Sequence, residues 1–242
     1  MRPWHENKIL DCKEGLISIP KNFRKFEPHP YVALGAPYKD NFGPWYLRIG
    51  VVKRLILAEK YLRSEDSNLC FLLFDAWRPI TVQDFMFNHA VDQQCLLHGI
   101  NRNDSRNETQ LKSVVDKVSK FWASPSLNPS TPPPHSTGGA VDLTLAYKDG
   151  KQLDMGGQID EIGEISEPDY FSQYDQFDNQ LFAFRSHSRR CLLAQSMNRA
   201  GFIQHPNEWW HFSYGDQMWA WANNVSSAIY GACVGESKFI TD

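Results

Sequence analysis

The chain has 242 residues, of which 42% are hydrophobic and 22% are charged, and its formal net charge at pH 7 is −3. This composition is typical of an ordinary globular protein, so we expect a single domain over residues 1–242 with a sizeable buried core. A slightly negative chain without a cluster of Lys and Arg has no general attraction to nucleic acid or anionic membranes. The expected partner is therefore a small molecule, and the oligomeric state is left open.

Neither a membrane segment nor a secretion signal is predicted. No stretch approaches the roughly 18 apolar residues that cross a bilayer, and residues 1–8 carry charges where a signal peptide would be apolar. We therefore expect a cytoplasmic protein. The five cysteines are an odd number without C-x-x-C spacing, which predicts buried free thiols rather than disulfides or a cysteine metal site.

The first third of the chain contains one clear helix and one clear strand. Residues 1–35 are irregular and rich in proline, with a possible edge strand at 16–19. Residues 50–62 place apolar side chains at helical spacing, which predicts an amphipathic helix packed on a sheet. Residues 69–74 form a continuous apolar run that is too short for a free-standing helix and predicts a central strand.

The predicted central strand leads directly into Asp75-Ala-Trp-Arg78-Pro79. A guanidinium stays charged at any relevant pH, and its fork can hold an oxyanion as negative charge develops. A structural ion pair between Arg78 and Asp75 is the alternative interpretation. The residues themselves leave both interpretations open.

Helices and a proline-rich connector are predicted next. Residues 80–98 predict a helix that ends before Gly99, and apolar positions within 111–122 predict another. Five prolines in residues 123–134 predict an extended connector.

Residues 134–145 read Pro-His-Ser-Thr-Gly-Gly-Ala-Val-Asp-Leu-Thr-Leu. The alternation over 140–147 predicts a strand in which Asp142 points away from the more apolar face. Gly138 and Gly139 permit a sharp turn that can fold His135 back toward Asp142. Because a His and an Asp at this spacing also occur by chance, the stretch alone leaves a metal site and an ordinary loop open.

Residues 148–178 are acidic and rich in glycine, which predicts a long excursion from the core. The segment could be a lid over a binding site, with Asp160 as our candidate residue, or a solvated acidic loop. Residues 179–200 predict a helix stopped by Gly201. Residues 217–223 predict a short helix, followed by a loosely patterned tail to residue 242.

Residues 208–212 read Glu-Trp-Trp-His-Phe, and the aromatic-rich residues 209–214 predict a short strand. Strict alternation would send Glu208 and His211 to opposite faces. Both can serve one site only if Glu208 lies in the turn begun by residues 205–207. A core strand with a capping Glu is the alternative. Ordinary surface or core positions are expected for six histidines: His5, His29, His89, His98, His187 and His205.

These motifs together resemble the zinc D-alanyl-D-alanine dipeptidases, the family that includes vancomycin-resistance dipeptidases. The resemblance rests on His135-x6-Asp142, on Glu208-x-x-His211 and on the sequence from Asp75 to Pro79, and it covers most of the chain. It implies a single α+β domain with a central antiparallel or mixed sheet. Helices would pack mainly on one side of this sheet, and the zinc site would lie on its open face.

The resemblance also implies a metal centre and a mechanism. One zinc per chain would be held by His135, Asp142 and His211, with Glu208 as the general base and Arg78 stabilising the oxyanion. Zinc would lower the pKa of its water toward about 7, so that Glu208 can accept the proton during attack on the peptide carbonyl.

Two further residues, Asp75 and Asp160, are candidates for substrate binding. The chain departs from the family pattern nearby: Pro133 stands where the family often has Ser, and the usual M-G-T-x-F-D reads Met155-Gly-Gly-Gln-Ile-Asp160. The implied reaction is hydrolysis of D-alanyl-D-alanine to two D-alanines. The alternatives are a D,D-carboxypeptidase acting on longer peptidoglycan peptides and a non-enzymatic zinc-binding domain.

Overall fold

The computed structural model describes residues 2–39 and 43–233. Its centre is a five-stranded sheet in the order β3-β5-β6-β8-β7. The pairing of β3 (Arg24–Lys25) with β5 (Leu69–Asp75) is parallel. The pairings among β5, β6 (Ala140–Tyr147), β8 (His211–Ser213) and β7 (Ile203–Gln204) are antiparallel. The predicted α+β class with a mixed sheet is therefore confirmed.

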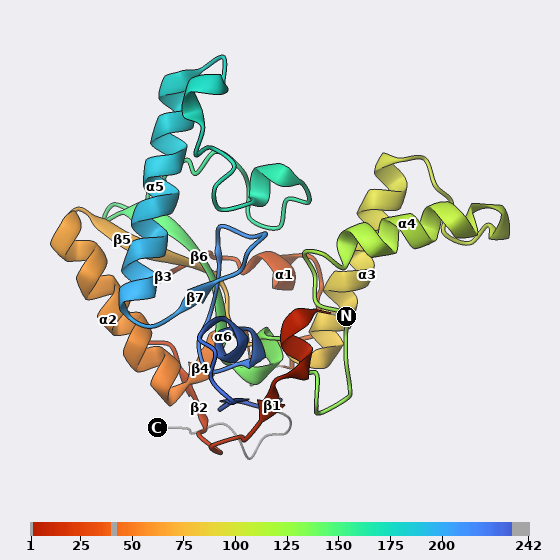
Figure 1. The fold of residues 1–242 in the computed structure, drawn as a ribbon, viewed down its shortest axis with the longest axis horizontal. Helices are drawn as coiled ribbons and strands as arrows, with labels where there is room; N and C mark the ends of the chain where they lie inside the picture. The colour runs from red at the N-terminus through yellow and green to blue at the C-terminus, as the bar shows by residue number, and fades with distance from the viewer. Residues whose placement is uncertain (1, 40–42, 234–242) are drawn as a thin grey trace.

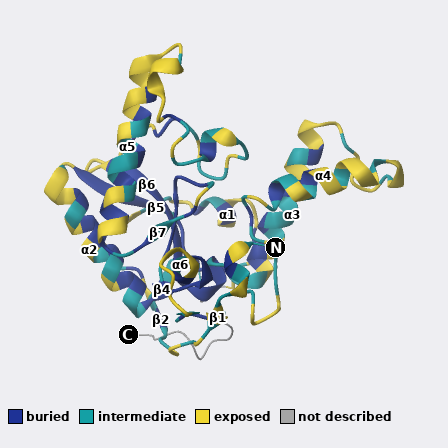
Figure 2. Cartoon of the chain, viewed as in Figure 1, coloured by how far each residue is buried: buried dark blue, intermediate teal, exposed yellow. Residues whose placement is uncertain are grey.

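Two long helices, α2 (Ile49–Glu65) and α5 (Gln180–Arg199), lie alongside each other against the sheet (Figure 1). Their apolar side chains share one core cluster with the strands, which includes Leu55, Phe71, Val141, Leu143 and Leu193. Burying a side chain of this size stabilises the fold by roughly 1.5–3 kcal/mol. Figure 2 shows the buried sheet and the more exposed outer ends of the helices. The helices predicted over 50–62 and 179–200 and the strands predicted over 69–74 and 140–147 are confirmed.

A separate apolar cluster holds α3 (Ile80–Leu97) to α4 (Glu108–Val118). The predicted helix over 80–98 is confirmed, but the predicted helix over 111–122 extends too far because α4 ends at Val118. Trp122 lies beyond it in a final turn whose amide donates to the Val118 carbonyl (2.9 Å). The apolar pattern of the sequence continues beyond the end of the helix because Trp122 packs into the same cluster as α3 and α4.

Short elements complete the described chain. The remaining strands are β1 (Lys8–Ile9), paired with β9 (Ser227–Ala228), and β2 (Leu16–Ser18), paired with β4 (Tyr46–Arg48). The short helices are α1 (Pro30–Ala33) and α6 (Gln217–Ala222), and the 3-10 turns are η1 (Pro3–Glu6), η2 (Ser105–Asn107), η3 (His135–Thr137), η4 (Glu164–Ser166) and η5 (Tyr174–Gln176). The last nine residues of the predicted tail, 234–242, lie outside the described residues.

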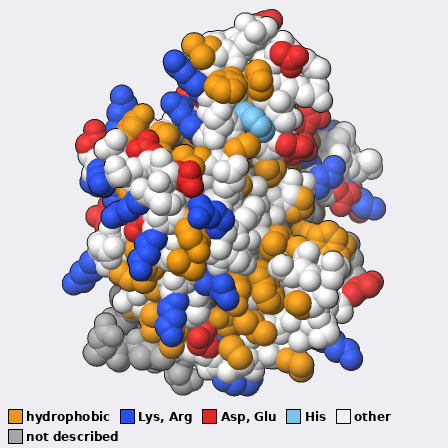
Figure 3. Space-filling view, turned by 60° about the vertical axis from the view of Figure 1, so that its left-hand side comes forward, with side chains coloured by type: hydrophobic (Ala, Val, Ile, Leu, Met, Phe, Trp, Pro, Cys, Tyr) orange, Lys and Arg blue, Asp and Glu red, His pale blue; other side chains and the backbone are white. Residues whose placement is uncertain are grey.

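Among the described helices, none combines the length and the apolar character that a bilayer crossing requires. Over the face drawn in Figure 3, basic and acidic side chains are interspersed, with hydrophobic side chains between them.

Candidate metal centre

Strand register brings two of the predicted ligands together. Asp142 of β6 pairs directly with His211 of β8, and opposite residues of an antiparallel pair project their side chains to the same side of a sheet. His135 reaches the same place from η3, which is followed by the predicted turn. Gly138 adopts φ 72° there, and a Cβ would overlap Leu16, so only glycine fits.

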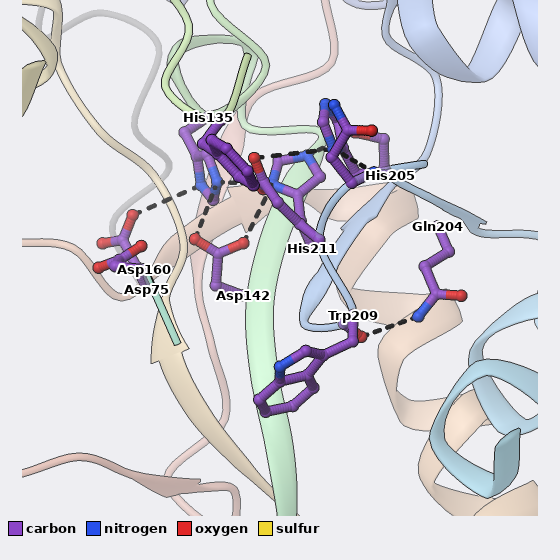
Figure 4. A network of polar contacts seen from close by, with 12 residues as sticks. Asp75, His135, Asp142, Asp160, Gln204, His205, Trp209 and His211 are labelled. Atoms are coloured by element: carbon purple, nitrogen blue, oxygen red, sulfur yellow. Dashed lines mark hydrogen bonds and ion pairs between the residues drawn. The ribbon is translucent and has the colours of Figure 1, made fainter. Parts of the chain in front are cut away.

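The three side chains direct their donor atoms at a common point (Figure 4). His135 Nε2 lies 3.1 Å from His211 Nδ1 and 3.2 Å from Asp142 Oδ2, and His211 Nδ1 lies 3.0 Å from Asp142 Oδ1. Two ligands bound about 2.0–2.1 Å from a tetrahedral zinc are about 3.3 Å apart. The group is buried and could hold a metal ion.

Hydrogen bonds on the outer side of each imidazole fix which ring nitrogen carries the hydrogen in the neutral form. His135 Nδ1 donates to the Ala76 carbonyl (2.6 Å), because a carbonyl can only accept. His211 Nε2 faces Ser213 Oγ (3.2 Å), whose own hydrogen goes to Asp216 (2.6 Å), so Nε2 must donate. In the neutral form of each ring, the inner nitrogen then carries the lone pair and faces the other ring, which is the arrangement of metal-ligating histidines.

The carboxylate of Asp142 completes the argument for a cation. Its Oδ1 is buried and accepts no hydrogen bond, although His211 Nδ1 is only 3.0 Å away. A buried anion that faces two lone pairs is costly unless a cation lies between them. The residues present therefore fit a divalent metal.

Glu208 lies in the turn immediately before β8. Its Oε2 is 3.7 Å from His211 Nδ1 and its Oε1 is 3.6 Å from His205 Nδ1. Burial, reinforced by the charge of Asp142, raises the pKa of Glu208 to about 8. A cation at the ligand group would lower this pKa, because it favours the ionised form.

The strand predicted over 209–214 is wrong at its start, because β8 begins at His211. Trp209 donates its backbone N–H to the Ser166 carbonyl (2.9 Å) rather than to a neighbouring strand, and its own carbonyl accepts from Gln204 Nε2 (2.8 Å). The turn therefore extends to Trp210. Because the strand begins only at His211, the side chains of Glu208 and His211 can face the same cavity.

Arg78 both forms an ion pair and faces the cavity beside the ligand group. Its Nε and Nη2 donate to Asp75 Oδ2 at 3.0 and 2.7 Å, and its Nη2 lies 3.5 Å from Asp142 Oδ2. Asp75 is fully buried, and it accepts further hydrogen bonds from His29 (3.0 Å) and Tyr38 (3.2 Å). Burial opposes the charge of Arg78, but Asp75 raises the pKa of Arg78 above its usual value. Arg78 lines the cavity, and its hydrogen bonds to Asp75, which is not a lining residue, hold the guanidinium in position.

The excursion over 148–178 brings Asp160 to the cavity wall. Its Oδ2 accepts a hydrogen bond from Tyr31 (2.8 Å), and its backbone adopts φ 68°, which is uncommon outside glycine. Burial and the charge of Asp142 raise the pKa of Asp160 to about 8. Apart from an isolated bridge at Gln152, these described residues form only 3-10 turns and loops.

Sequence reasoning missed several residues of this region. His205, expected to be ordinary, is buried with its ring centroid 5.5 Å from that of His211. His29 supports Asp75, and Tyr31 contacts both Asp160 and Arg78 (3.4 Å). Arg2 lines the cavity from the other end of the chain. The position of His205 three residues before Glu208 was the only available signal, and Arg2 had none.

The chain has clear sequence relatives among known proteins. The family model described as D-ala-D-ala dipeptidase, Peptidase M15, matches residues 25–229. A D-alanyl-D-alanine dipeptidase of Synechocystis sp. (strain ATCC 27184 / PCC 6803 / Kazusa) is 41% identical over 227 residues, which is 93% of this chain and 91% of that protein. A D-alanyl-D-alanine dipeptidase of Escherichia coli (strain K12) is 37% identical over 156 residues, 64% of this chain and 61% of that protein.

Two solved structures show a more distant likeness. The LD-carboxypeptidase LdcB is 15% identical with a TM-score of 0.43, over 92% of this chain and 77% of that chain. A vancomycin-resistance D,D-pentapeptidase, VanY, in complex with Zn(II) is 12% identical with a TM-score of 0.45, over 86% of this chain and 90% of that chain. Both TM-scores are below 0.5, so the family assignment comes from the sequence matches.

Proposed function

Because this chain belongs to the D-Ala-D-Ala dipeptidase family of M15 metallopeptidases, we propose that it hydrolyses the dipeptide D-alanyl-D-alanine to two D-alanines with one zinc ion per chain. The observation that carries the proposal is the convergence of His135, Asp142 and His211, with Glu208 beside them. This is the donor set of a hydrolytic zinc site, which keeps a position open for water.

In this proposal His135 Nε2, His211 Nδ1 and the Asp142 carboxylate hold the zinc. When bound, zinc supplies the Lewis acidity that activates water and polarises a carbonyl. The hydrogen bonds from His135 to the Ala76 carbonyl and from His211 to Ser213 keep each ring in the required orientation and tautomer.

Glu208 is the proposed general base. It would accept a proton from the attacking water and return it to the amine that leaves, as general acid–base catalysis requires. Its support is its position: the carboxylate is buried, lies within 3.7 Å of a proposed ligand atom and lines the same cavity. Within the described residues, no hydrogen bond to the Glu208 carboxylate would compete for the proton.

Arg78 and Asp160 would act at the two polar groups of the substrate nearest to them. Arg78 is held against Asp75, and its guanidinium would stabilise the negative charge that develops on the carbonyl oxygen. Asp160, with Tyr31 donating to it, would accept the ammonium group of the substrate. Asp75 would act by positioning Arg78.

An assay of D-Ala-D-Ala against a capped tripeptide that ends in D-Ala-D-Ala tests the proposal. Only a dipeptidase requires the free amino group, so we expect release of D-alanine from the dipeptide alone. Cleavage of the capped peptide at an equal or higher rate would instead establish a D,D-carboxypeptidase. An open groove of about 960 Å³ adjoins the cavity at Arg2, Ala123 and Pro134.

A further inference from the structure

The catalytic cavity contains a cation that the proposed mechanism does not use. Arg2 precedes the segment covered by the family model, which begins at residue 25, yet its guanidinium lines the cavity together with His205 and Glu208. It stands where the cavity meets the open groove, since both are lined by Arg2, Ala123 and Pro134. A ligand entering from this groove would meet Arg2 before it reached His211.

Neutral groups hold Arg2 in place. Its Nη2 donates to the carbonyls of Ser119 and Phe121, both at 3.3 Å, and its Nη1 lies 3.4 Å from His205 Nε2. Its guanidinium carbon lies 5.4 Å from the ring centre of Trp4. Within residues 2–39 and 43–233 it forms no ion pair with a carboxylate. Burial lowers the pKa of Arg2. The nearby charge of Glu208 offsets only part of this effect.

The other arginine of the cavity, Arg78, already donates hydrogen bonds to neighbouring side chains. Arg78 donates to Asp75 through two nitrogens and to Gln83 Oε1 through a third (2.9 Å). Its charge is compensated by Asp75 and by Asp142 at 3.5 Å. A negatively charged ligand would therefore find more unbalanced positive charge at Arg2 than at Arg78.

The ends of the cavity differ in charge in the way that a zwitterionic dipeptide requires. In Figure 4 the ligand group lies between Asp160 on one side and His205 on the other. Asp160 offers a carboxyl group, whose ionised form a bound ammonium group would favour, and His205 lies against the Arg2 guanidinium. An extended dipeptide spans about 7 Å, so its two charged ends would lie on opposite sides of its central carbonyl.

We propose that Arg2 binds the C-terminal carboxylate of the substrate and thereby selects a free dipeptide acid. This inference rests on the proposed function, because it assigns a further contact to the same substrate. The scissile carbonyl would lie over His135, Asp142 and His211, with the ammonium group toward Asp160 and the carboxylate toward Arg2. The N-terminal segment is thus part of the specificity site.

The test compares D-Ala-D-Ala with D-alanyl-D-alaninamide, which keeps the peptide bond but lacks the carboxylate charge. Arg2→Met should lower kcat/KM for the free acid by about 10–100-fold, the range expected for a charged hydrogen bond, mainly by raising KM. It should leave the amide almost unchanged. Arg2→Lys, which keeps the charge, should retain part of the preference for the acid, and Arg106→Met, at an exposed arginine, should retain all of it.

The results separate this inference from the proposed function. Wild-type protein that hydrolyses neither compound would overturn the proposed function. Wild-type protein that hydrolyses both equally well, or an Arg2→Met variant that slows both by the same factor, would overturn the assignment of Arg2, because Arg2 would then act only through His205 and Glu208. A higher kcat/KM in Arg2→Met would also overturn it and identify Arg2 as an obstruction.

Discussion

At the scale of single residues, the candidate site is defined by lone pairs that the fold leaves facing one another. His135 and His211 each use one ring nitrogen as a donor to an outer partner. The second nitrogen of each ring then faces the other ring and Asp142, at 3.0–3.2 Å. A cation converts this repulsion into binding energy, so the geometry argues for a metal more strongly than the residue types do.

Glu208→Gln tests the general base. The amide keeps the shape of the side chain but cannot accept the proton, so kcat should fall by at least about 10²–10⁴-fold while zinc content stays near one per chain. Steady-state kinetics and metal analysis on the same sample measure both. Glu108→Gln, at an exposed position, is the control. Activity near wild type would remove Glu208 from the mechanism, and loss of zinc would make it a ligand.

Arg78→Lys tests the oxyanion contact. Lysine keeps the charge but loses the fork, so kcat should fall by about 10²–10³-fold with a smaller change in KM, as for removal of an oxyanion donor. The variant also breaks one of the two hydrogen bonds to Asp75, so its melting temperature should fall. Asp75→Asn is the comparison. A destabilised Arg78→Lys protein with normal kcat would leave Arg78 a structural role only.

At the scale of elements, one buried side chain ties the 148–178 segment to α5. Arg190 is 1% exposed, and it donates through Nε to the Met155 carbonyl (2.9 Å) and through Nη1 to the Glu167 carbonyl (2.8 Å). These two carbonyls lie on either side of Asp160 along the chain. The segment is therefore anchored at both ends of the part that reaches the cavity.

Arg190→Met should loosen this anchor. Loss of the charged hydrogen bonds should lower the free energy of unfolding by roughly 1.5–3 kcal/mol. The KM for D-Ala-D-Ala should rise more than kcat falls, because Asp160 would be less well placed. Urea denaturation and steady-state kinetics measure the two effects, with exposed Arg185→Met on the same helix as the control. An unchanged KM in a destabilised variant would show that Asp160 does not depend on this anchor.

At the scale of the whole molecule, metal binding should be linked to folding. The proposed ligands come from η3, β6 and β8, which are assembled only in the folded chain. A ligand that binds the native state alone stabilises it by about 2.7 kcal/mol at a hundredfold excess over Kd. Zinc should therefore raise the melting temperature, and a chelator should lower it and abolish activity.

His135→Ala tests whether the effect of zinc on the melting temperature depends on the proposed ligand group. It should remove both the zinc-dependent shift in melting temperature and the bound metal, whereas His98→Ala, at an exposed histidine, should keep both. Calorimetry with added zinc or chelator measures the shift. Full zinc occupancy in the His135→Ala protein would exclude this residue from the ligand set.

Several features were determined by the sequence itself. Helical apolar spacing located α2 and the short apolar run located β5, because these patterns report which side chains must be buried. Glycine stop signals, at Gly99 and Gly201, located the ends of α3 and α5. The Gly138–Gly139 turn and the following strand were also predictable, since local backbone conformation requires them. The resemblance then indicated the family, which the comparisons confirm.

Only the tertiary structure decided how distant residues meet. The turn before β8 extends to Trp210 because Trp209 bonds to Ser166, a contact across 43 positions of the chain (209 − 166). The same long-range packing puts Arg2 beside His205. Local patterns encode burial and turns, whereas contacts between remote segments depend on strand register and loop packing, which no single stretch of sequence specifies.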